Sequence, residues 1–388
     1  MRIRIAAIFG TRPDAIKMAP VLTELQAYRD EFHTVTIATA QHREMLDQVL
    51  DIFKIRVNYD LDVMQPRQSL AYLVKSVLSK LDGVIRKIRP DLILVQGDTS
   101  TTFVASLAAF YSKIPVGHVE AGLRTEDKYR PYPEEMNRRL TTAIADFHFA
   151  PTRTARNALL AENIPAEKIY LTGNTVIDAL LRTVRKDYFF SHPFLRKIVE
   201  DCRRLRRKMV LITCHRRENW GAPMAGACRA IRKLAERHRE VTFIFPVHLN
   251  PVVREVVYPI LKGLPNVFLT DPLEYESFVN LMNEIYLVLT DSGGMQEEAP
   301  SLGKPVLVLR EVTERPEAVV AGTVKLVGMD ERRIVTETSR LLDSLVAYKR
   351  MASATNPYGD GKAAWRIVQT LRRHYGFRRM RVKEFRGY

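Results

Sequence analysis

Short apolar segments rich in β-branched residues alternate with amphipathic segments along the first half of the chain. The apolar segments predict buried strands at Ile3–Phe9, Thr34–Thr39, Leu92–Gln96, Val116–Val119 and Phe147–Ala150. Apolar residues recur at helical spacing over Ala15–Tyr28, Arg43–Phe53, Leu70–Ile88 and Thr101–Tyr111. Strands that alternate with helices in this way predict βαβ units and a parallel sheet.

The same alternation starts again in the second half of the chain. Further strands are predicted at Val210–Thr213, Thr242–Pro246, Val267–Thr270, Tyr286–Thr290 and Pro305–Leu309. We therefore predict an α/β protein with two Rossmann-like, doubly wound domains that face each other across a cleft. The chain is expected to change domain near Gly173-Asn174, which gives domains of residues 1–172 and 173–364. A final helix from about Lys362 is expected to return residues 365–388 to the first domain.

Length and composition agree with a globular protein of two domains. The chain has 388 residues, of which 46% are apolar and 27% are charged. It contains no run of 18 uncharged apolar residues, so we expect no insertion into a membrane.

The formal net charge of +16 is high, and two basic segments at residues 203–208 and 372–386 contribute much of it. These segments are either solvated basic faces or attract anionic partners such as nucleotide sugars, nucleic acid or lipid headgroups. Aromatic residues do not interleave with the basic ones at regular spacing, and no nucleic-acid-reading module is visible, so nucleic acid is not an expected partner.

The cysteines and the N-terminus predict a cytoplasmic protein. Cys202, Cys214 and Cys228 are odd in number and lack CxxC spacing, so neither a structural disulfide nor a zinc site is expected. The basic and apolar start of the chain lacks a small-residue cleavage site and is interrupted at Pro13, so it reads as a core strand rather than a signal peptide. No metal-ligand spacing is found, and no GxGxxG follows the first strand, so we expect neither a metal nor NAD.

The segment from Asp291 to Pro305 predicts an anion site. Ser292, Gly293 and Gly294 stand between an apolar strand and a helix, where unsatisfied backbone N–H groups and the helix dipole attract phosphate. Glu297 and Glu298 are predicted in the first helical turn, as acceptors for ribose hydroxyls. The alternative is a tight turn that Ser292 merely caps.

Polar residues also follow the other predicted strands. They are Gly10, Thr11, Arg12, Asp14 and Lys17; Gly97, Asp98 and Thr99; His118 and Glu120; Glu134, Glu135 and Arg138; His215 to Asn219; His248; and Glu314 to Glu317. Because strand ends of one parallel sheet share an edge, such residues suggest a phosphate-binding half and an acid/base half.

Individually, these residues have structural explanations. Asp98 could cap a helix. Glu134 and Glu135 could form surface pairs with Arg138 and Arg139, and His248 could be a hydrogen-bonded core residue.

Ten motifs, in order, carry a resemblance to a known family. They are GTRPDAIKMAP, TAQHREMLDQVLDIF, QGDTSTTFVASLAAFY, PVGHVEAGLRT, PYPEEMNRRL, TGNTVIDAL, HRREN, PVHLNPVVRE, DSGGMQEEAPSLGKPVLVLR and TERPEA. Together they resemble the non-hydrolysing UDP-N-acetylglucosamine 2-epimerases from Ile3 to about Gly361. The resemblance implies a glycosyltransferase-B-like fold and interconversion of UDP-GlcNAc and UDP-ManNAc. It also implies a homodimer without NAD or metal that supplies precursors for bacterial cell-surface polysaccharide. It assigns no role to the basic run near Arg206 or to the tail after Tyr375.

The resemblance also implies roles for individual residues. The catalytic candidates are Asp98, Glu120, Glu134, Lys17, Arg138 and His215. The UDP-binding candidates are Arg12, His215, Phe278, Ser292, Gly293, Gly294, Glu298 and Arg315. The sequence does not assign a carboxylate to either face of the sugar.

The family further implies an effector site in some members, where a second UDP-GlcNAc binds beside the substrate. The matching positions are Gln41, Glu44, Arg67, Gln68, Glu134, Arg216 and His248. The alternative is that these residues only pack the cleft.

The C2 proton of the sugar has no neighbouring carbonyl, so its direct removal is difficult. The family implies elimination of UDP to a 2-acetamidoglucal and re-addition with the proton on the other face, which needs two acid/base groups. Rival functions are a retaining glycosyltransferase, a hydrolysing epimerase and a nucleotide-sugar sensor.

Overall fold

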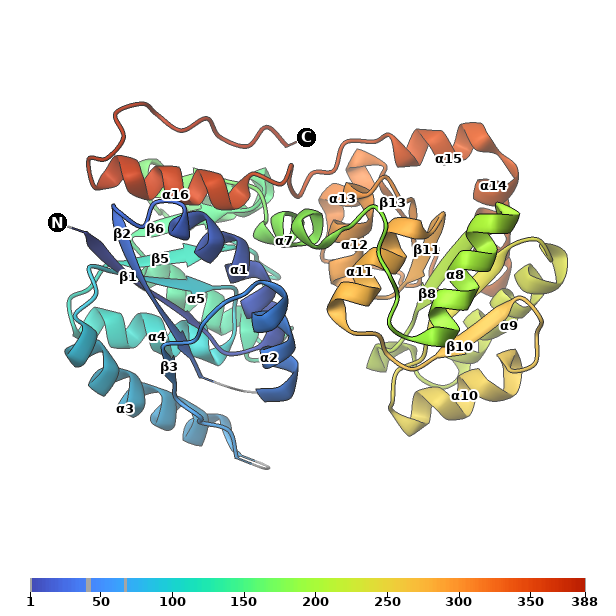
Figure 1. Ribbon diagram of the computed structural model, residues 1–388, viewed down its shortest axis with the longest axis horizontal. Helices are drawn as coiled ribbons and strands as arrows, with labels where there is room; N and C mark the ends of the chain where they lie inside the picture. Colours follow the sequence, from blue (N-terminus) through green and yellow to red (C-terminus); the bar gives the residue numbers. More distant parts are fainter. Residues whose placement is uncertain (1, 40–42, 66–67, 388) are drawn as a thin grey trace. The chain divides into compact units, whose positions relative to one another are not determined.

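The structure is a computed structural model that describes residues 2–39, 43–65 and 68–387. Contacts divide the chain into unit 1, Met1–Arg182 with Tyr358–Gly387, and unit 2, which comprises Thr183–Pro357. Each unit contains one parallel sheet with helices around it, and both are shown in Figure 1. The predicted fold class of two doubly wound α/β domains is confirmed.

Unit 1 has a seven-stranded sheet in the order β3-β2-β1-β4-β5-β6-β7. Its strands are β1 (Ile3–Phe9), β2 (Phe32–Ala38), β3 (Tyr59–Asp60), β4 (Leu92–Gln96), β5 (Val116–Val119), β6 (Phe147–Ala150) and β7 (Ile169–Leu171). Its helices are α1 (Arg12–Gln26), α2 (Arg43–Ile52), α3 (Leu70–Ile88), α4 (Ser100–Tyr111), α5 (Glu134–Ile144), α6 (Arg153–Ala161), α7 (Thr175–Thr183) and α16 (Ala363–His374).

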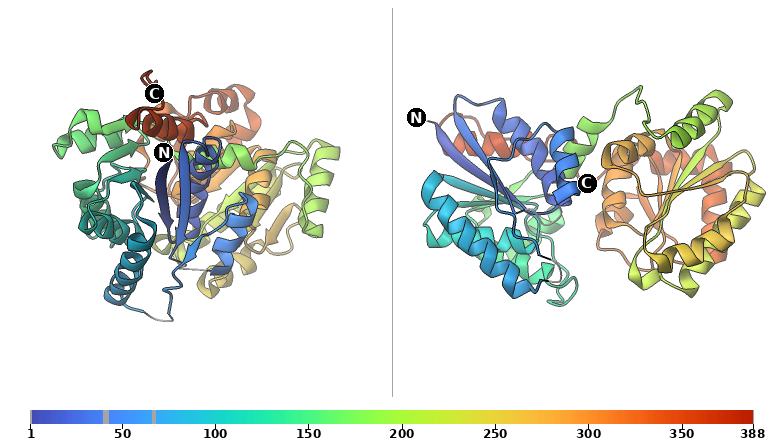
Figure 2. Two further views of the ribbon diagram at one scale, coloured as in Figure 1. Left: turned by 60° about the vertical axis from the view of Figure 1, so that its left-hand side comes forward. Right: turned by 60° about the horizontal axis from the view of Figure 1, so that its bottom comes forward.

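Unit 2 has a six-stranded sheet in the order β10-β9-β8-β11-β12-β13. Its strands are β8 (Met209–Thr213), β9 (Thr242–Pro246), β10 (Val267–Thr270), β11 (Leu287–Thr290), β12 (Val306–Val308) and β13 (Val324–Leu326). Its helices are α8 (Pro193–Leu205), α9 (Ala222–Arg237), α10 (Pro251–Leu261), α11 (Tyr275–Glu284), α12 (Gly293–Ser301), α13 (Pro316–Ala321), α14 (Glu331–Asp343) and α15 (Leu345–Ala352). Figure 2 shows this sheet with helices on both sides.

The core of each unit lies between its sheet and the covering helices. In unit 1, Val77 and Leu81 of α3 and Val104 of α4 pack with Ile8 and Val95 of the central strands. In unit 2, a separate cluster joins α9 and α10 to the strands and includes Phe243 and Phe245 of β9. These apolar layers fix the positions of the loops that follow the strands.

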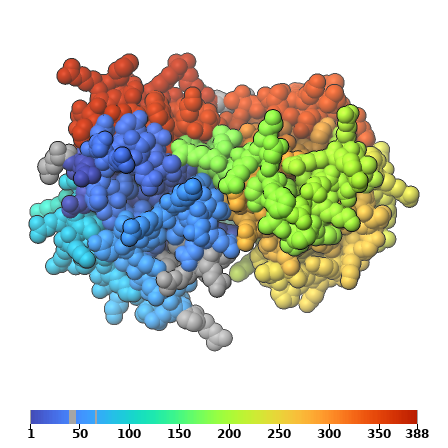
Figure 3. All heavy atoms as spheres, in the orientation of Figure 1, coloured from blue at the N-terminus to red at the C-terminus, as the bar shows by residue number. Residues whose placement is uncertain are grey.

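The last helix lies in unit 1. On α16, Gln369 donates a hydrogen bond to the Tyr28 hydroxyl, and Arg372 forms a bidentate ion pair with Glu31. In the space-filling view the C-terminal segment lies beside the N-terminal segment of the same unit (Figure 3). The chain enters unit 2 at Thr183, so α7 belongs to unit 1 in this division.

Helix α1 begins at Arg12 and not at the predicted Ala15. Thr11 caps it: its hydroxyl accepts a hydrogen bond from the Asp14 N–H, while the Asp14 carboxylate accepts one from the Thr11 N–H. Pro13 lies in the first turn, where a missing N–H has no cost, so it does not interrupt the helix.

Candidate active site

The two sheets have the strand order 3-2-1-4-5-6 of a Rossmann fold, with one extra strand in unit 1. In such sheets the strand order reverses beside the first strand, and ligands bind beyond the carboxyl ends there. The reversal lies between β1 and β4 in unit 1 and between β8 and β11 in unit 2. Asp98, His215, Arg216 and Ser292 lie in the loops after these strands, and Arg12, Lys17, Gly293 and Gly294 lie in the helices α1 and α12 that follow.

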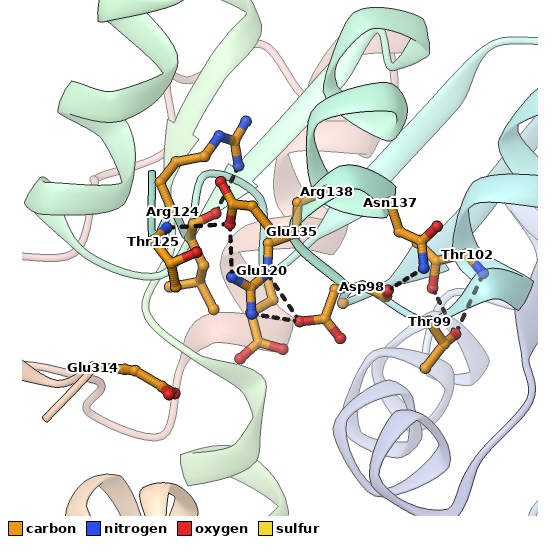
Figure 4. A network of polar contacts seen from close by, with 12 residues as sticks. Asp98, Thr99, Thr102, Glu120, Arg124, Thr125, Glu135, Asn137, Arg138 and Glu314 are labelled. Carbon is orange, nitrogen blue, oxygen red and sulfur yellow. Dashed lines mark hydrogen bonds and ion pairs between the residues drawn. The ribbon is translucent and has the colours of Figure 1, made fainter. Parts of the chain in front are cut away.

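In unit 1, Arg138 of α5 links two carboxylates at this edge. Its Nε lies 2.9 Å from Asp98 Oδ2, and its Nη1 lies 3.1 Å from Glu135 Oε2. Figure 4 shows its guanidinium group between the two acids, with Asn137 donating to the Asp98 carbonyl at 2.9 Å. The arrangement holds the Asp98 carboxylate in one orientation beyond β4.

These contacts decide between the interpretations of the residues. The cap of α4 is Thr99, whose hydroxyl accepts from the Thr102 N–H, so the interpretation of Asp98 as a helix cap is wrong. Glu135 is fully buried and pairs with both Arg138 and Arg139, so the interpretation of Glu135 as part of a surface pair is wrong as well.

Glu120 lies directly after β5 and is 6% exposed. Its carboxylate accepts hydrogen bonds from Lys17 Nζ at 2.6 and 2.7 Å, from Asn174 Nδ2 at 3.0 Å and from Gln96 Nε2. Its backbone has φ of 66°, a conformation that non-glycine residues seldom adopt. Four hydrogen bonds from three side chains and an unusual backbone therefore fix this carboxylate.

Asp14 connects the loops after β1 and β4. Its carboxylate accepts from the N–H groups of Gly10 and Thr11 and from the Thr99 hydroxyl, at 3.1 to 3.3 Å. Burial, helped by the nearby Asp98 charge, raises the pKa of Asp14 to about 6, although its hydrogen bonds oppose this.

His118 of β5 supports the same loop from inside the sheet. Its Nε2 lies 2.7 Å from the Gly97 carbonyl oxygen, and the ring is fully buried. Burial lowers the pKa of His118 to about 4, so the ring is neutral at pH 7 and donates its Nε2 hydrogen to the carbonyl. This bond fixes the peptide that precedes Asp98.

The other predicted residues of unit 1 are less enclosed. Glu134 is the first residue of α5 and Arg12 the first of α1, and both are partly exposed. Gln68 is described and accepts from the Gln65 N–H at 3.1 Å. Of the effector candidates, Gln41, Arg67 and the side chain of Glu44 lie outside the described residues.

In unit 2, Asp291 joins the two loops at the strand reversal. Its fully buried carboxylate accepts from the N–H groups of His215 and Arg216, both at 2.8 Å, and from Asn219 Nδ2 at 3.0 Å. The sequence places Asp291 only as the residue after a strand. Here it fixes the His215–Arg216 backbone beside the start of α12.

Helix α12 begins at Gly293, with Ser292 as its N-terminal flanking residue. The Ser292 side chain makes no capping hydrogen bond, so the alternative of a turn capped by Ser292 is wrong. A Cβ built on Gly293 would lie 3.6 Å from an Arg216 nitrogen and 3.8 Å from an Arg315 nitrogen. The glycine-rich start of α12 therefore lies between two guanidinium groups, which suits a phosphate.

The prediction that Glu297 and Glu298 stand in the first turn is wrong, because the helix begins at Gly293 and its first turn contains no acid. Glu297 is buried and pairs with Arg315 Nε at 2.5 Å. Glu298 lies next along α12 and is partly exposed. Arg315, which flanks the anion site, is thus held in place by Glu297.

His248 is exposed, so the interpretation as a core histidine is wrong. Its ring stacks on that of His215, with centroids 5.6 Å apart and planes at 12°. Partial burial, together with the charge that His215 would carry, lowers the pKa of His248. Arg216 and Phe278 of α11 are partly exposed in the same unit.

Sequence reasoning missed three amides. Gln96 and Asn174 hold Glu120, and Asn137 holds the Asp98 backbone. Gln96 is a polar residue at the end of a buried strand, and this is the one sequence signal that could have indicated a missed amide.

Among the described residues, no group of three or more His, Cys, Asp or Glu side chains is arranged to hold a metal ion. No helix in the described part of the chain is long and apolar enough to cross a membrane.

Known proteins resemble the chain over its whole length. The family model described as UDP-N-acetylglucosamine 2-epimerase matches residues 24–372. The UDP-N-acetylglucosamine 2-epimerase of Bacillus subtilis is 53% identical over 386 residues, which cover 100% of this chain and 99% of the relative. The crystal structure of UDP-GlcNAc 2-epimerase from Neisseria meningitidis bound to UDP-GlcNAc has a TM-score of 0.84 and 50% identity, with 95% of this chain and 99% of that chain covered. The Methanocaldococcus jannaschii enzyme, in complex with UDP-GlcNAc and UDP, has a TM-score of 0.74 and 31% identity, with 95% and 99% covered.

Proposed function

Because the chain belongs to the UDP-N-acetylglucosamine 2-epimerase family, we propose that it interconverts UDP-GlcNAc and UDP-ManNAc by inversion at C2. The fixed Glu120 carboxylate in unit 1 carries this proposal. A proton on carbon needs a positioned base, and Glu120 is held by Lys17, Asn174 and Gln96 at the strand ends where ligands bind.

We propose elimination followed by re-addition. In the first step a carboxylate takes the C2 proton, the C1–O bond breaks, and UDP leaves with the electron pair, which yields a 2-acetamidoglucal. In the second step UDP oxygen attacks C1 while a second acid delivers a proton to the opposite face of C2. Asp98, Glu120 and Glu134 are the candidates for these two groups, with Lys17 and Arg138 as their polar partners.

Unit 2 supplies the stabilisation of the leaving group in this proposal. Charge accumulates on the diphosphate as the C1–O bond breaks, and fixed cations and helix N–H groups stabilise it most when they need not reorganise. The start of α12, flanked by Arg216 and by Arg315 on its Glu297 partner, has these properties. His215 and Arg12 are further candidates for stabilising the diphosphate. Glu298 and Phe278 are the candidates for binding the nucleoside.

The decisive experiment is incubation with UDP-GlcNAc alone in deuterated water, followed by NMR and mass spectrometry. The proposal expects UDP-ManNAc with deuterium at C2 and deuterium in recovered UDP-GlcNAc. Free ManNAc with UDP would indicate a hydrolysing enzyme. A lack of turnover together with tight UDP binding would overturn the proposal and favour a transferase or a sensor.

A further inference from the structure

The basic tail belongs to neither polar cluster, yet it forms the wall of a cavity in unit 1. The cavity has a volume of about 690 Å³ and lies between β7, the residues before it, α16 and the tail at Arg381–Glu384. A second cavity of about 770 Å³ on α6 shares the tail residues Arg381 to Glu384. Each volume suits a small-molecule ligand.

Specific contacts hold the tail in this place. The Phe385 N–H donates to the Leu171 carbonyl oxygen at 2.9 Å, as an added strand would at the β7 edge. The Phe385 side chain is buried, and the Arg366 guanidinium lies 5.4 Å from the ring centroid. Arg156 of α6 pairs with Glu384 at 3.2 Å. The cavity walls are therefore defined by packing and hydrogen bonds.

Arginine and lysine side chains outnumber the carboxylates, those of Glu167 and Glu384, in the lining of the two cavities. Arg153 of α6, Arg373 of α16, and Arg381, Lys383 and Arg386 of the tail line them. In the described part of the chain, none of these five side chains has a carboxylate within 4.0 Å. Unpaired like charges around a concavity repel one another, and a multivalent anion would relieve that repulsion.

The donors around the first cavity match phosphate oxygens. Guanidinium groups form bidentate, charge-assisted hydrogen bonds with phosphate. Burial raises the pKa of Tyr170, although the charge of Arg373 opposes this, so the hydroxyl is a neutral donor at pH 7. We propose that this region binds a soluble small molecule that carries two or more phosphate groups, at a site separate from the candidate active site.

Two double variants of equal charge change test the proposal. Arg373→Gln/Arg381→Gln removes two cations from the cavity, whereas Arg206→Gln/Arg207→Gln removes two exposed cations from the basic run in unit 2. Titration calorimetry with inorganic triphosphate is carried out at physiological salt, with and without saturating UDP. We expect the cavity variant to bind triphosphate about tenfold or more weakly than the wild type. The control variant should bind it like the wild type, and UDP affinity should be equal in all three.

Equal weakening in both variants would overturn the proposal, because it would indicate an unspecific charge effect. Absence of triphosphate binding by the wild type would overturn it too. A sedimentation assay with phosphatidylglycerol vesicles separates the sources of phosphate. Vesicle binding that depends on Arg373 and Arg381, without triphosphate binding, would assign the region to a lipid surface and contradict a soluble ligand. Thermal unfolding checks that both variants fold, as expected for replacement of exposed side chains.

Discussion

At the scale of single residues, the carboxylates of unit 1 differ in how firmly they are held. The buried Glu120 carboxylate accepts four hydrogen bonds, Asp98 pairs with one guanidinium group, and Glu134 is partly exposed. A base that must face one hydrogen atom gains from rigid placement. The structure thus ranks the candidates by constraint, with Glu120 the most firmly held and Glu134 the least.

We predict that Asp98→Asn, Glu120→Gln and Glu134→Gln each lower the turnover of UDP-GlcNAc by about 100-fold or more, as is typical when a positioned acid or base is removed. Each variant should keep its fold and its affinity for UDP, because the amide preserves the shape of the side chain. A coupled assay of UDP-ManNAc formation gives the rates, and circular dichroism gives the fold. Turnover near the wild-type rate in all three would contradict the roles proposed for them.

Substitution of the UDP-binding candidates in unit 2 should have a different effect. We expect Arg315→Ala and Glu298→Ala to weaken UDP binding, since the first removes a cation beside α12 and the second an acceptor for a ribose hydroxyl. Titration calorimetry with UDP measures this. Arg332→Ala on α14, an exposed arginine, is the matched control and should bind UDP like the wild type. Unchanged affinity in both site variants would place the nucleotide elsewhere.

At the scale of the elements, Asp178 controls how α16 begins. Its buried carboxylate accepts from the N–H groups of Ala363 and Ala364 at 3.1 and 2.9 Å. Burial raises the pKa of Asp178 to about 6, against the effect of these hydrogen bonds. Since the folded protein then holds this proton more tightly than the unfolded chain, the contribution of Asp178 to stability falls as pH rises from about 4 to about 6.

Asp178→Asn should remove this pH dependence. The amide lacks one acceptor oxygen, which adds a constant cost, but it does not ionise. We therefore expect the unfolding free energy of the variant, relative to that of the wild type, to rise by about 1 to 2 kcal/mol between pH 4 and pH 6. Urea unfolding at several pH values measures the difference, and contributions from other shifted groups such as Asp14 and His118 cancel in it. A difference that stays constant over this window would contradict the raised pKa.

The sequence predicts most elements because their apolar residues recur at clear helical or strand spacing, but it misses the shortest elements. The strands β3, β7 and β13 have only two or three residues and owe their pairing to a sheet edge that already exists. In the site, motifs indicate the charged residues. The amides Gln96 and Asn174 are missed because only the fold brings them to Glu120.

At the scale of the whole molecule, the effector hypothesis concerns how a second bound UDP-GlcNAc changes the rate of turnover. If a second UDP-GlcNAc favours the active form, the coupling between the two ligands is reciprocal. We expect pure UDP-ManNAc to react only after a lag, which a trace of UDP-GlcNAc abolishes. Arg67→Ala should lengthen the lag without weakening UDP binding in the same proportion. Immediate turnover of UDP-ManNAc at full rate, without response to UDP-GlcNAc, would exclude the effector site.

The position of α16 in unit 1 has a consequence for the folding of the chain during translation. Unit 2 is one continuous stretch, Thr183–Pro357, and all its strands leave the exit tunnel before α16 is made. Unit 1 cannot complete its fold until α16 has been translated, because the α1 surface that α16 will cover stays open until then. The second domain in sequence is thus the first that can finish folding. A ribosome that stops early releases a chain whose exposed apolar surface lies in its first half, where chaperones or proteases would recognise it.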